Sequence, residues 1–168
     1  LAVLPGEVME PFRAIRPDAS AASWALRFVA SHPIIKVILS GMSAEEQVAD
    51  NLNTFVNYEP MTEQELAAVD EVTAKIRARV RIGCTGCRYC MPCPNGVDIP
   101  RNFSIWNQFG MYANVGSTRW EWNHRIPDDA KAKNCVECGA CEAACPQHLS
   151  IRENLAALQI ELDKATAE

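Results

Sequence analysis

The sequence predicts a mixed fold in two parts, an incomplete strand-and-helix segment over residues 1–80 and an all-α domain over residues 81–168. All eight cysteines lie beyond residue 83, in two short runs. Before them, apolar stretches alternate between strand and helix patterns, and after them the apolar residues keep helical spacing. With 168 residues, the chain is long enough for one ordinary domain or two small ones.

The first segment predicts two short parallel strands. Residues 8–10 form a strand candidate that ends at Pro11. Residues 34–39 form a β-branched run that is typical of a buried strand and breaks at Ser40 and Gly41. Two strands cannot form a sheet that buries much surface, so this segment is expected to be incomplete.

Helix signals surround these strands. Asp18 can cap one helix. Two capping boxes, Ser43 with Glu46 and Thr62 with Glu65, each predict the start of another helix. The apolar residues that follow the two boxes recur at helical spacing: Val48, Leu52, Phe55 and Val56, then Leu66, Val69, Val72, Ile76 and Val80.

Helix signals also flank the two cysteine runs. Asp98, with Pro100 in the first turn, predicts the start of one helix. Asp128 predicts the start of a short one, and Ser150 with Glu153 that of a last one. The apolar residues of the first and last of these helices share one face: Ile99, Phe103 and Trp106, then Ile151, Leu155, Leu158 and Leu162.

The cysteine spacing predicts two [4Fe–4S] clusters. The second run follows the cluster motif C-x2-C-x2-C-x3-C-P, and the first run is one residue shorter before its last cysteine. Three closely spaced thiolates can wrap one cubane, whereas the fourth lies too far along the chain to close it comfortably. In two-cluster ferredoxins the fourth cysteine ligates the other cluster. The predicted ligands are Cys84, Cys87, Cys90 and Cys145 for cluster 1, and Cys93, Cys135, Cys138 and Cys141 for cluster 2.

Three other interpretations remain open. Structural zinc sites use four thiolates per ion, usually as two separated pairs rather than as consecutive triplets. Four disulfides would need an oxidising compartment, and no signal-peptide pattern opens this sequence. Clusters with a purely structural role would show the same spacing. Two crossed clusters nevertheless favour electron transfer, so an iron–sulfur electron carrier is the expectation.

Composition narrows the class of partner and the compartment. The net charge of −5 argues against a nucleic-acid partner. No apolar run approaches the roughly 20 residues that cross a bilayer. Cysteine chemistry of this kind implies a reducing cytoplasm. The chain begins with Leu1 rather than methionine, which is consistent with a truncated chain or a gene fragment.

Residues 8–76 resemble the carboxy-terminal end of an aldo/keto reductase, a TIM-barrel family. The runs Val8-Met9-Glu10-Pro11 and Val37-Ile38-Leu39-Ser40-Gly41-Met42-Ser43 resemble its seventh and eighth strands. Glu46-Gln47-Val48-Ala49-Asp50-Asn51 resembles its eighth helix, which holds the adenine end of NADPH. The resemblance therefore implies a C-terminal fragment of the (β/α)8 barrel. It carries over a set of nucleotide-binding positions: Ser43, Gln47, Asp50 and Asn51.

This sequence also departs from the family's nucleotide site. Gly41 stands where many members have a lysine, and Gln47 replaces an arginine that often binds the 2′-phosphate. Binding of NADP(H) is therefore expected only in an intact protein. A capped surface helix with an ordinary polar face explains the same residues equally well.

The whole chain resembles aldo/keto reductase oxidoreductases that carry a ferredoxin domain behind the barrel. The family's catalytic residues lie in the first half of the barrel, so no catalytic residue is expected here. The resemblance implies the electron-transfer part of an oxidoreductase, and a free-standing ferredoxin-type carrier is the alternative. The implied partners are a redox protein, the missing part of the barrel or a second copy of the chain, with neither nucleic acid nor membrane. The helical pattern around the cysteines resembles the α-helical ferredoxins.

Overall fold

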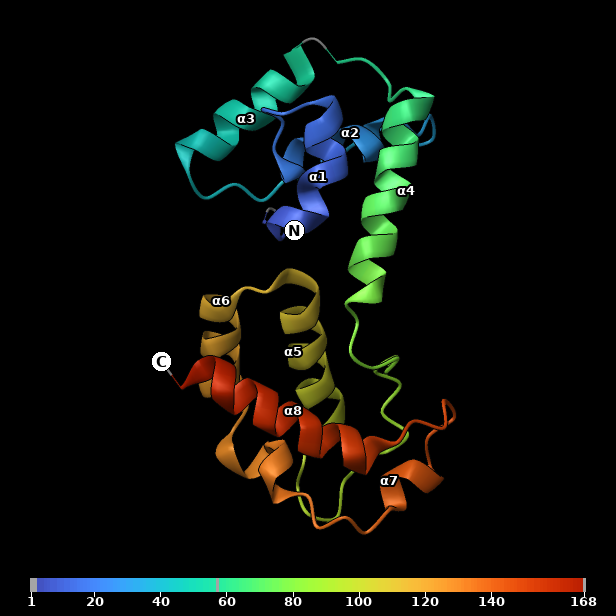
Figure 1. Cartoon of the computed structure of the whole chain (residues 1–168), viewed down its shortest axis with the longest axis vertical. Helices are drawn as coiled ribbons and strands as arrows, with labels where there is room; N and C mark the ends of the chain where they lie inside the picture. Colours follow the sequence, from blue (N-terminus) through green and yellow to red (C-terminus); the bar gives the residue numbers. More distant parts are fainter. Residues whose placement is uncertain (1–2, 57, 168) are drawn as a thin grey trace. The chain divides into compact units, whose positions relative to one another are not determined.

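The computed structural model describes residues 3–56 and 58–167, so the start at Leu1 lies outside the described residues. It divides into two compact units, Leu1–Ala78 and Arg79–Glu168 (Figure 1). The described part of the chain is helical and contains no strand. In this part, no helix is both long enough and apolar enough to cross a membrane.

The first unit is built from four helices within its described residues: α1 (Gly6–Ile15), α2 (Ala21–Ala30), α3 (Glu45–Val56) and α4 (Glu63–Ala78). Its core lies where α1 and α2 meet α4. Phe12 stacks on Trp24 with ring centroids 4.2 Å apart, and Val72 of α4 packs into the same cluster.

Both predicted strands of this unit are wrong, and the described residues contain no fragment of a barrel sheet. Residues 8–10 lie inside α1, because Val8, Met9 and Phe12 fall on one helix face and are buried there. Ile34 lies in a turn, the rest of residues 34–39 has no regular secondary structure, and no neighbouring strand is present among the described residues. Val37 and Leu39 are 77% and 92% exposed, so the run is not buried either.

The two capping boxes of this unit have different outcomes. Thr62 and Glu65 form the predicted reciprocal box: the Thr62 amide donates to Glu65 Oε2 at 2.9 Å and the Glu65 amide to Thr62 Oγ1 at 3.3 Å. The other box is predicted to pair Ser43 with Glu46. The bond seen there runs from the Ser43 amide to Gln47 Oε1 at 2.8 Å. Helix α2 begins after Ser20, whose hydroxyl accepts from the Ser23 amide, rather than after Asp18.

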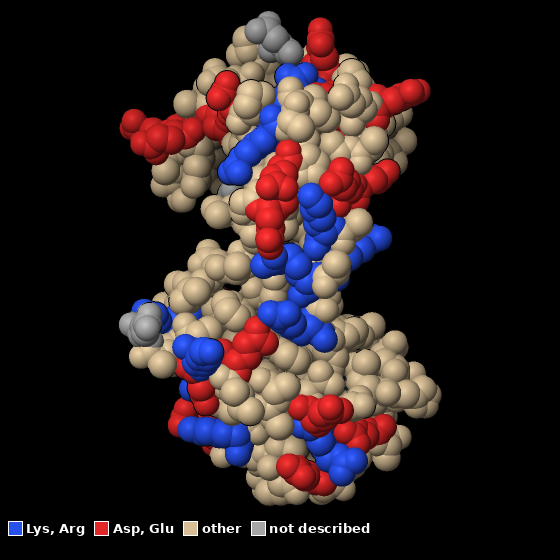
Figure 2. Space-filling model, in the orientation of Figure 1, with Lys and Arg blue, Asp and Glu red and all other residues tan. Residues whose placement is uncertain are grey.

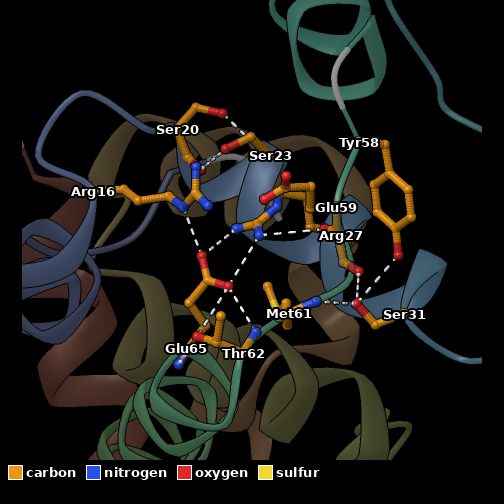
Figure 3. A network of polar contacts seen from close by, with 10 residues as sticks. All are labelled: Arg16, Ser20, Ser23, Arg27, Ser31, Tyr58, Glu59, Met61, Thr62 and Glu65. Carbon is orange, nitrogen blue, oxygen red and sulfur yellow. Dashed lines mark hydrogen bonds and ion pairs between the residues drawn. The ribbon is translucent and has the colours of Figure 1, made fainter.

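Glu65 is the centre of a buried polar network. Figure 3 shows two guanidinium groups directed at its carboxylate. Arg27 Nη1 and Nη2 donate to Glu65 Oε1 and Oε2 at 2.7 and 3.0 Å, and Arg16 Nε donates to Oε1 at 2.6 Å. The hydrogen bonds from Arg27, more than any other contact, lower the pKa of Glu65 to about 2 against the opposing effect of burial. The network therefore ties α4 to α2 and to the end of α1.

Helix α3 has no buried residue, in contrast to its neighbours. Acidic side chains gather at its free end in Figure 2, where Glu45 and Glu46 occupy the first turn. Negative charge at a helix N-terminus is favourable, so these two side chains stabilise the start of α3. Leu52 and Val56, on the helix, are 61% and 72% exposed.

The second unit consists mainly of three α-helices, α5 (Ile99–Tyr112), α6 (Val115–Trp120) and α8 (Ile151–Thr166), with short turns between them. The turns are the π-helical η1 (Glu121–Arg125), the 3-10 helices η2 (Asp128–Ala130) and η3 (Ala132–Asn134), and the one-turn helix α7 (Ala140–Ala143). Helix α8 packs against α5, α6 and η3. Leu155, Leu158 and Leu162 of α8 are buried at helical spacing, as the sequence predicts.

Asn102 fixes the start of α5 against η2 and η3. The residue is fully buried, and its Nδ2 donates to the carbonyl oxygens of Asp98 and Ala130 at 2.8 and 2.9 Å. Its Oδ1 accepts from the Ala132 amide at 3.0 Å. Asp98 also accepts from the Arg101 amide at 3.3 Å, which is the predicted N-cap. Asn102 therefore joins the segment that follows the first cysteine run to the segment that precedes the second.

Candidate metal centre

Two cavities of the second unit are lined by cysteines. Cys84, Cys87, Cys90 and Cys145 line the first cavity, and Cys93, Cys135, Cys138 and Cys141 line the second. All eight are free thiols. The structure thus brings the cysteines together in the two groups of four into which the motif spacing divides them. Which thiolate ligates which cluster stays a prediction.

The backbone of both runs turns in the same way around the second cysteine. Gly86 and Arg88 flank Cys87 with φ of 69° and 65°, and Glu137 and Gly139 flank Cys138 with φ of 55° and 77°. Left-handed φ is costly for a residue other than glycine and is often found at functional sites. The repeated pattern curls each run, so that three cysteines reach one cavity.

The remaining walls of both cavities are largely apolar. Phe103 and Ile151 line the first cavity and Val97 and Leu155 the second, each at most 2% exposed. Six of the eight cysteines are themselves packed against this core: Cys84, Cys90, Cys93, Cys135, Cys141 and Cys145. Cys87 and Cys138 are exposed, so each cavity has one cysteine at the surface.

Burial makes the thiols of Cys90 and Cys141 poorer acids. It raises the pKa of the Cys90 thiol, and the three other sulfurs of the first cavity act in the same direction. Burial also raises the pKa of Cys141, the charges of Glu142 and Cys135 add to this rise, and the backbone hydrogen bond from Glu142 opposes it. A thiol must lose its proton to become a ligand, so binding of a metal here would release protons.

Each cavity also has an arginine in its wall, which the sequence interpretation missed. Arg88 lines the first cavity, and its Nη1 lies 3.7 Å from Asp98 Oδ1. Arg152 lines the second cavity. Its Nε donates to Glu142 Oε2 at 2.9 Å, and its Nη2 forms an ion pair with the same oxygen at 2.8 Å. Arg88 could have been noticed because it follows Cys87 directly. Arg152 carries no such signal, because only the fold brings α8 beside the second run.

The fit of a metal group can be judged from this donor set. Four soft thiolate donors per cavity with apolar walls suit an iron–sulfur cluster. Among the described residues, no three or more His, Cys, Asp or Glu side chains are grouped closely enough to hold a single metal ion. The residues present therefore fit one [4Fe–4S] cluster in each cavity.

A comparison with protein families bears on the same stretch. Residues 83–149 match the 4Fe-4S dicluster domain. The match includes all eight cysteines, and it supports iron–sulfur clusters and electron transfer in this dicluster domain. Comparisons with characterised proteins and with solved structures gave no match. None of these findings shows an aldo/keto reductase part.

Whether the four expected nucleotide-binding residues hold a nucleotide stays a prediction, and the structure places them in two groups. The Ser43 amide, before α3, donates to the side chain of Gln47 in the first turn of that helix. Asn51 Nδ2 donates to Ser40 Oγ at 2.9 Å, whereas Asp50 Oδ2 accepts from Ser20 Oγ at 2.6 Å. Asp50 thus faces α2, and the described structure ties the remaining three residues to the exposed segment that leads into α3.

Proposed function

We propose that the chain is the iron–sulfur electron-transfer part of an oxidoreductase and carries two [4Fe–4S] clusters in its dicluster domain. The observation that carries this proposal is the pair of cavities, each lined by four thiols, within the matched residues 83–149. A bound cluster supplies one-electron chemistry, with a potential that depends on charge, hydrogen bonds to sulfur and solvent exposure. The apolar walls and the half-buried thiols are what the polypeptide contributes to that potential.

The proposed ligand sets are crossed between the two runs. Cys145 completes the set of the first run and Cys93 that of the second, because each lines the cavity of the opposite run. Cys93 has one residue fewer than usual before it, yet it lies in the wall of the second cavity. The reduced thiols that such ligation needs place the protein, in this proposal, in the cytoplasm.

The finer part of the proposal is the aldo/keto reductase context. It rests on the sequence resemblance of residues 8–76, and the exposed apolar run at residues 34–39 is compatible with a strand segment that has no sheet to join. In such a protein the two clusters would together supply two electrons, and solvent one proton, which is what reduction of a barrel-bound NADP⁺ requires. An in-frame coding sequence upstream that specifies six barrel strands would support this context. Its absence would favour a free-standing ferredoxin-type carrier.

The decisive experiment is chemical analysis of protein purified without oxygen. We expect about eight irons and eight acid-labile sulfides per chain, because two cubanes hold that number. Reduction by dithionite should give an EPR spectrum of two interacting spins. A colourless anaerobic preparation that contains zinc and no sulfide would refute the proposal. A sample exposed to air must be run beside it, since oxidised clusters also leave colourless protein.

A further inference from the structure

One side chain belongs to the walls of both cavities. Ile99 lines the first cavity together with Phe103 and Ile151, and it lines the second together with Val97 and Leu155. Among the described residues that line these cavities, it is the one that they share. It is 1% exposed, so water does not reach it from outside.

The backbone around Ile99 is held from several sides. It is the first residue of α5, directly after the N-cap Asp98 and before Pro100, whose fixed φ suits a first helical turn. The Asp98 amide donates to the Ala130 carbonyl at 3.0 Å, and Asn102 ties the same turn to Ala132. The position of the Ile99 side chain is therefore set by the fold of the domain rather than by either cysteine run.

A buried aliphatic wall acts on a cluster through what it excludes. Solvent and hydrogen-bond donors stabilise the reduced cluster, which carries the greater negative charge, and so raise its potential. Ile151 can exert this effect on the first cavity and Val97 on the second. A side chain common to both walls excludes water and donors from both sites at once.

We infer that Ile99 shields both cluster sites from water, and that its aliphatic side chain keeps the midpoint potentials of the two clusters low together. This inference rests on the proposed function, because it presumes that both cavities are filled. It goes further in assigning one residue outside the cysteine motifs to the joint control of two redox centres. Replacement of Ile99 should then change two potentials, whereas replacement of a residue in a single wall should change one.

Three matched substitutions test this in the full chain: Ile99→Thr, Ile151→Thr and Val97→Thr. All three replace a β-branched, fully buried residue with threonine, which brings a hydroxyl donor to the same depth. Potentiometric titration of anaerobic protein, followed by EPR, gives a midpoint potential for each cluster. Iron content and the spin-interaction spectrum establish that both clusters remain in place. If threonine prevents loading, Ile99→Val and Ile151→Val remove a single methyl group and allow the same comparison.

We expect Ile99→Thr to raise both midpoint potentials, Ile151→Thr to raise one, and Val97→Thr to raise the other. A shift of one potential alone in the Ile99 variants, or of neither, would overturn the inference while the proposed function stands. Unaltered protein that binds no iron would refute the proposed function itself and the inference with it.

Discussion

Cys145 lines the same cavity as Cys84, although α5, α6 and three cysteines of the second run lie between them in the chain. Cys93 makes the reverse crossing into the cavity of the second run. The two runs are therefore not two separate metal-binding loops. Each site is complete only when the beginning and the end of the dicluster domain come together.

This crossing predicts which cysteine variants behave alike. Cys145→Ser should abolish the same EPR signal as Cys84→Ser, and Cys93→Ser the same signal as Cys135→Ser. Each variant should keep about half of the iron, since one cubane of two is lost. Pairing of Cys145→Ser with Cys135→Ser instead would show that each run fills its own site.

Asn102 should be critical for the stability of the second unit. Asn102→Ala leaves the buried Ala132 amide without its partner, and an unsatisfied buried donor costs about 1–3 kcal/mol. The Asp98 and Ala130 carbonyls lose their second hydrogen bond but still accept from a backbone amide. We expect a clear fall of the thermal unfolding midpoint, measured anaerobically by circular dichroism. Asn154→Ala is the matched control, because Asn154 is only half-buried and its side chain donates to the Ser150 carbonyl alone among the contacts seen. Equal effects of the two substitutions would contradict this prediction.

Gly110 is required by the close approach of the segment before the first cysteine run. A Cβ atom on Gly110 would lie 2.5 Å from the carbonyl oxygen of Arg79, a backbone atom that cannot simply move aside. Gly110→Ala should therefore destabilise the protein by about 1–3 kcal/mol through overpacking. Gly116→Ala is the comparison, because the new Cβ would make ordinary contact with Asn114 Oδ1 at 3.7 Å. Alanine at 116 should be neutral or stabilising, since it favours the helix.

Glu65 predicts an acid-dependent loss of stability in the first unit. Its pKa is about 2 in the folded protein, below the ordinary value of 4.5, so its contribution is fully present above pH 4.5 and is lost as the pH falls toward 2. The shift corresponds to a contribution on the order of 3 kcal/mol.

The variant Glu65→Gln isolates that contribution. It should melt at a lower temperature than the unaltered protein at pH 7, and the gap should narrow as the pH falls below 4.5. The exposed neighbour Glu63, changed to Gln, controls for the loss of one charge. Because the dicluster domain is the same in all three proteins, acid damage to it cancels in the difference. A gap that stays constant down to pH 2 would rule out this role.

The parts that the sequence predicts well are those fixed by neighbours in the chain. The capping pair Thr62 and Glu65, the N-cap Asp98 and the apolar face of α8 need a few residues of context, and all three are confirmed. The two curled cysteine runs follow from local spacing in the same way.

The strand predictions failed because they depended on partners. A short apolar run such as residues 8–10 fits a strand or a helix. Here the run is helical, because the helix α1 buries the apolar residues of the run against α4. Residues 34–39 have the side chains of a strand, but a strand also needs a second one beside it, and none lies there among the described residues. Ile99 and Arg152 escaped notice for a related reason, since their roles arise only when distant segments meet.

Six cysteines pack against the hydrophobic core of the second unit, so binding of the clusters and stability of this unit depend on each other. A group that binds only the folded form adds its binding free energy to folding, so the empty domain opens more often than the filled one. Proteases cleave the transiently opened form of a protein. In a cell starved of iron, the amount of intact protein should therefore fall without any change in its synthesis.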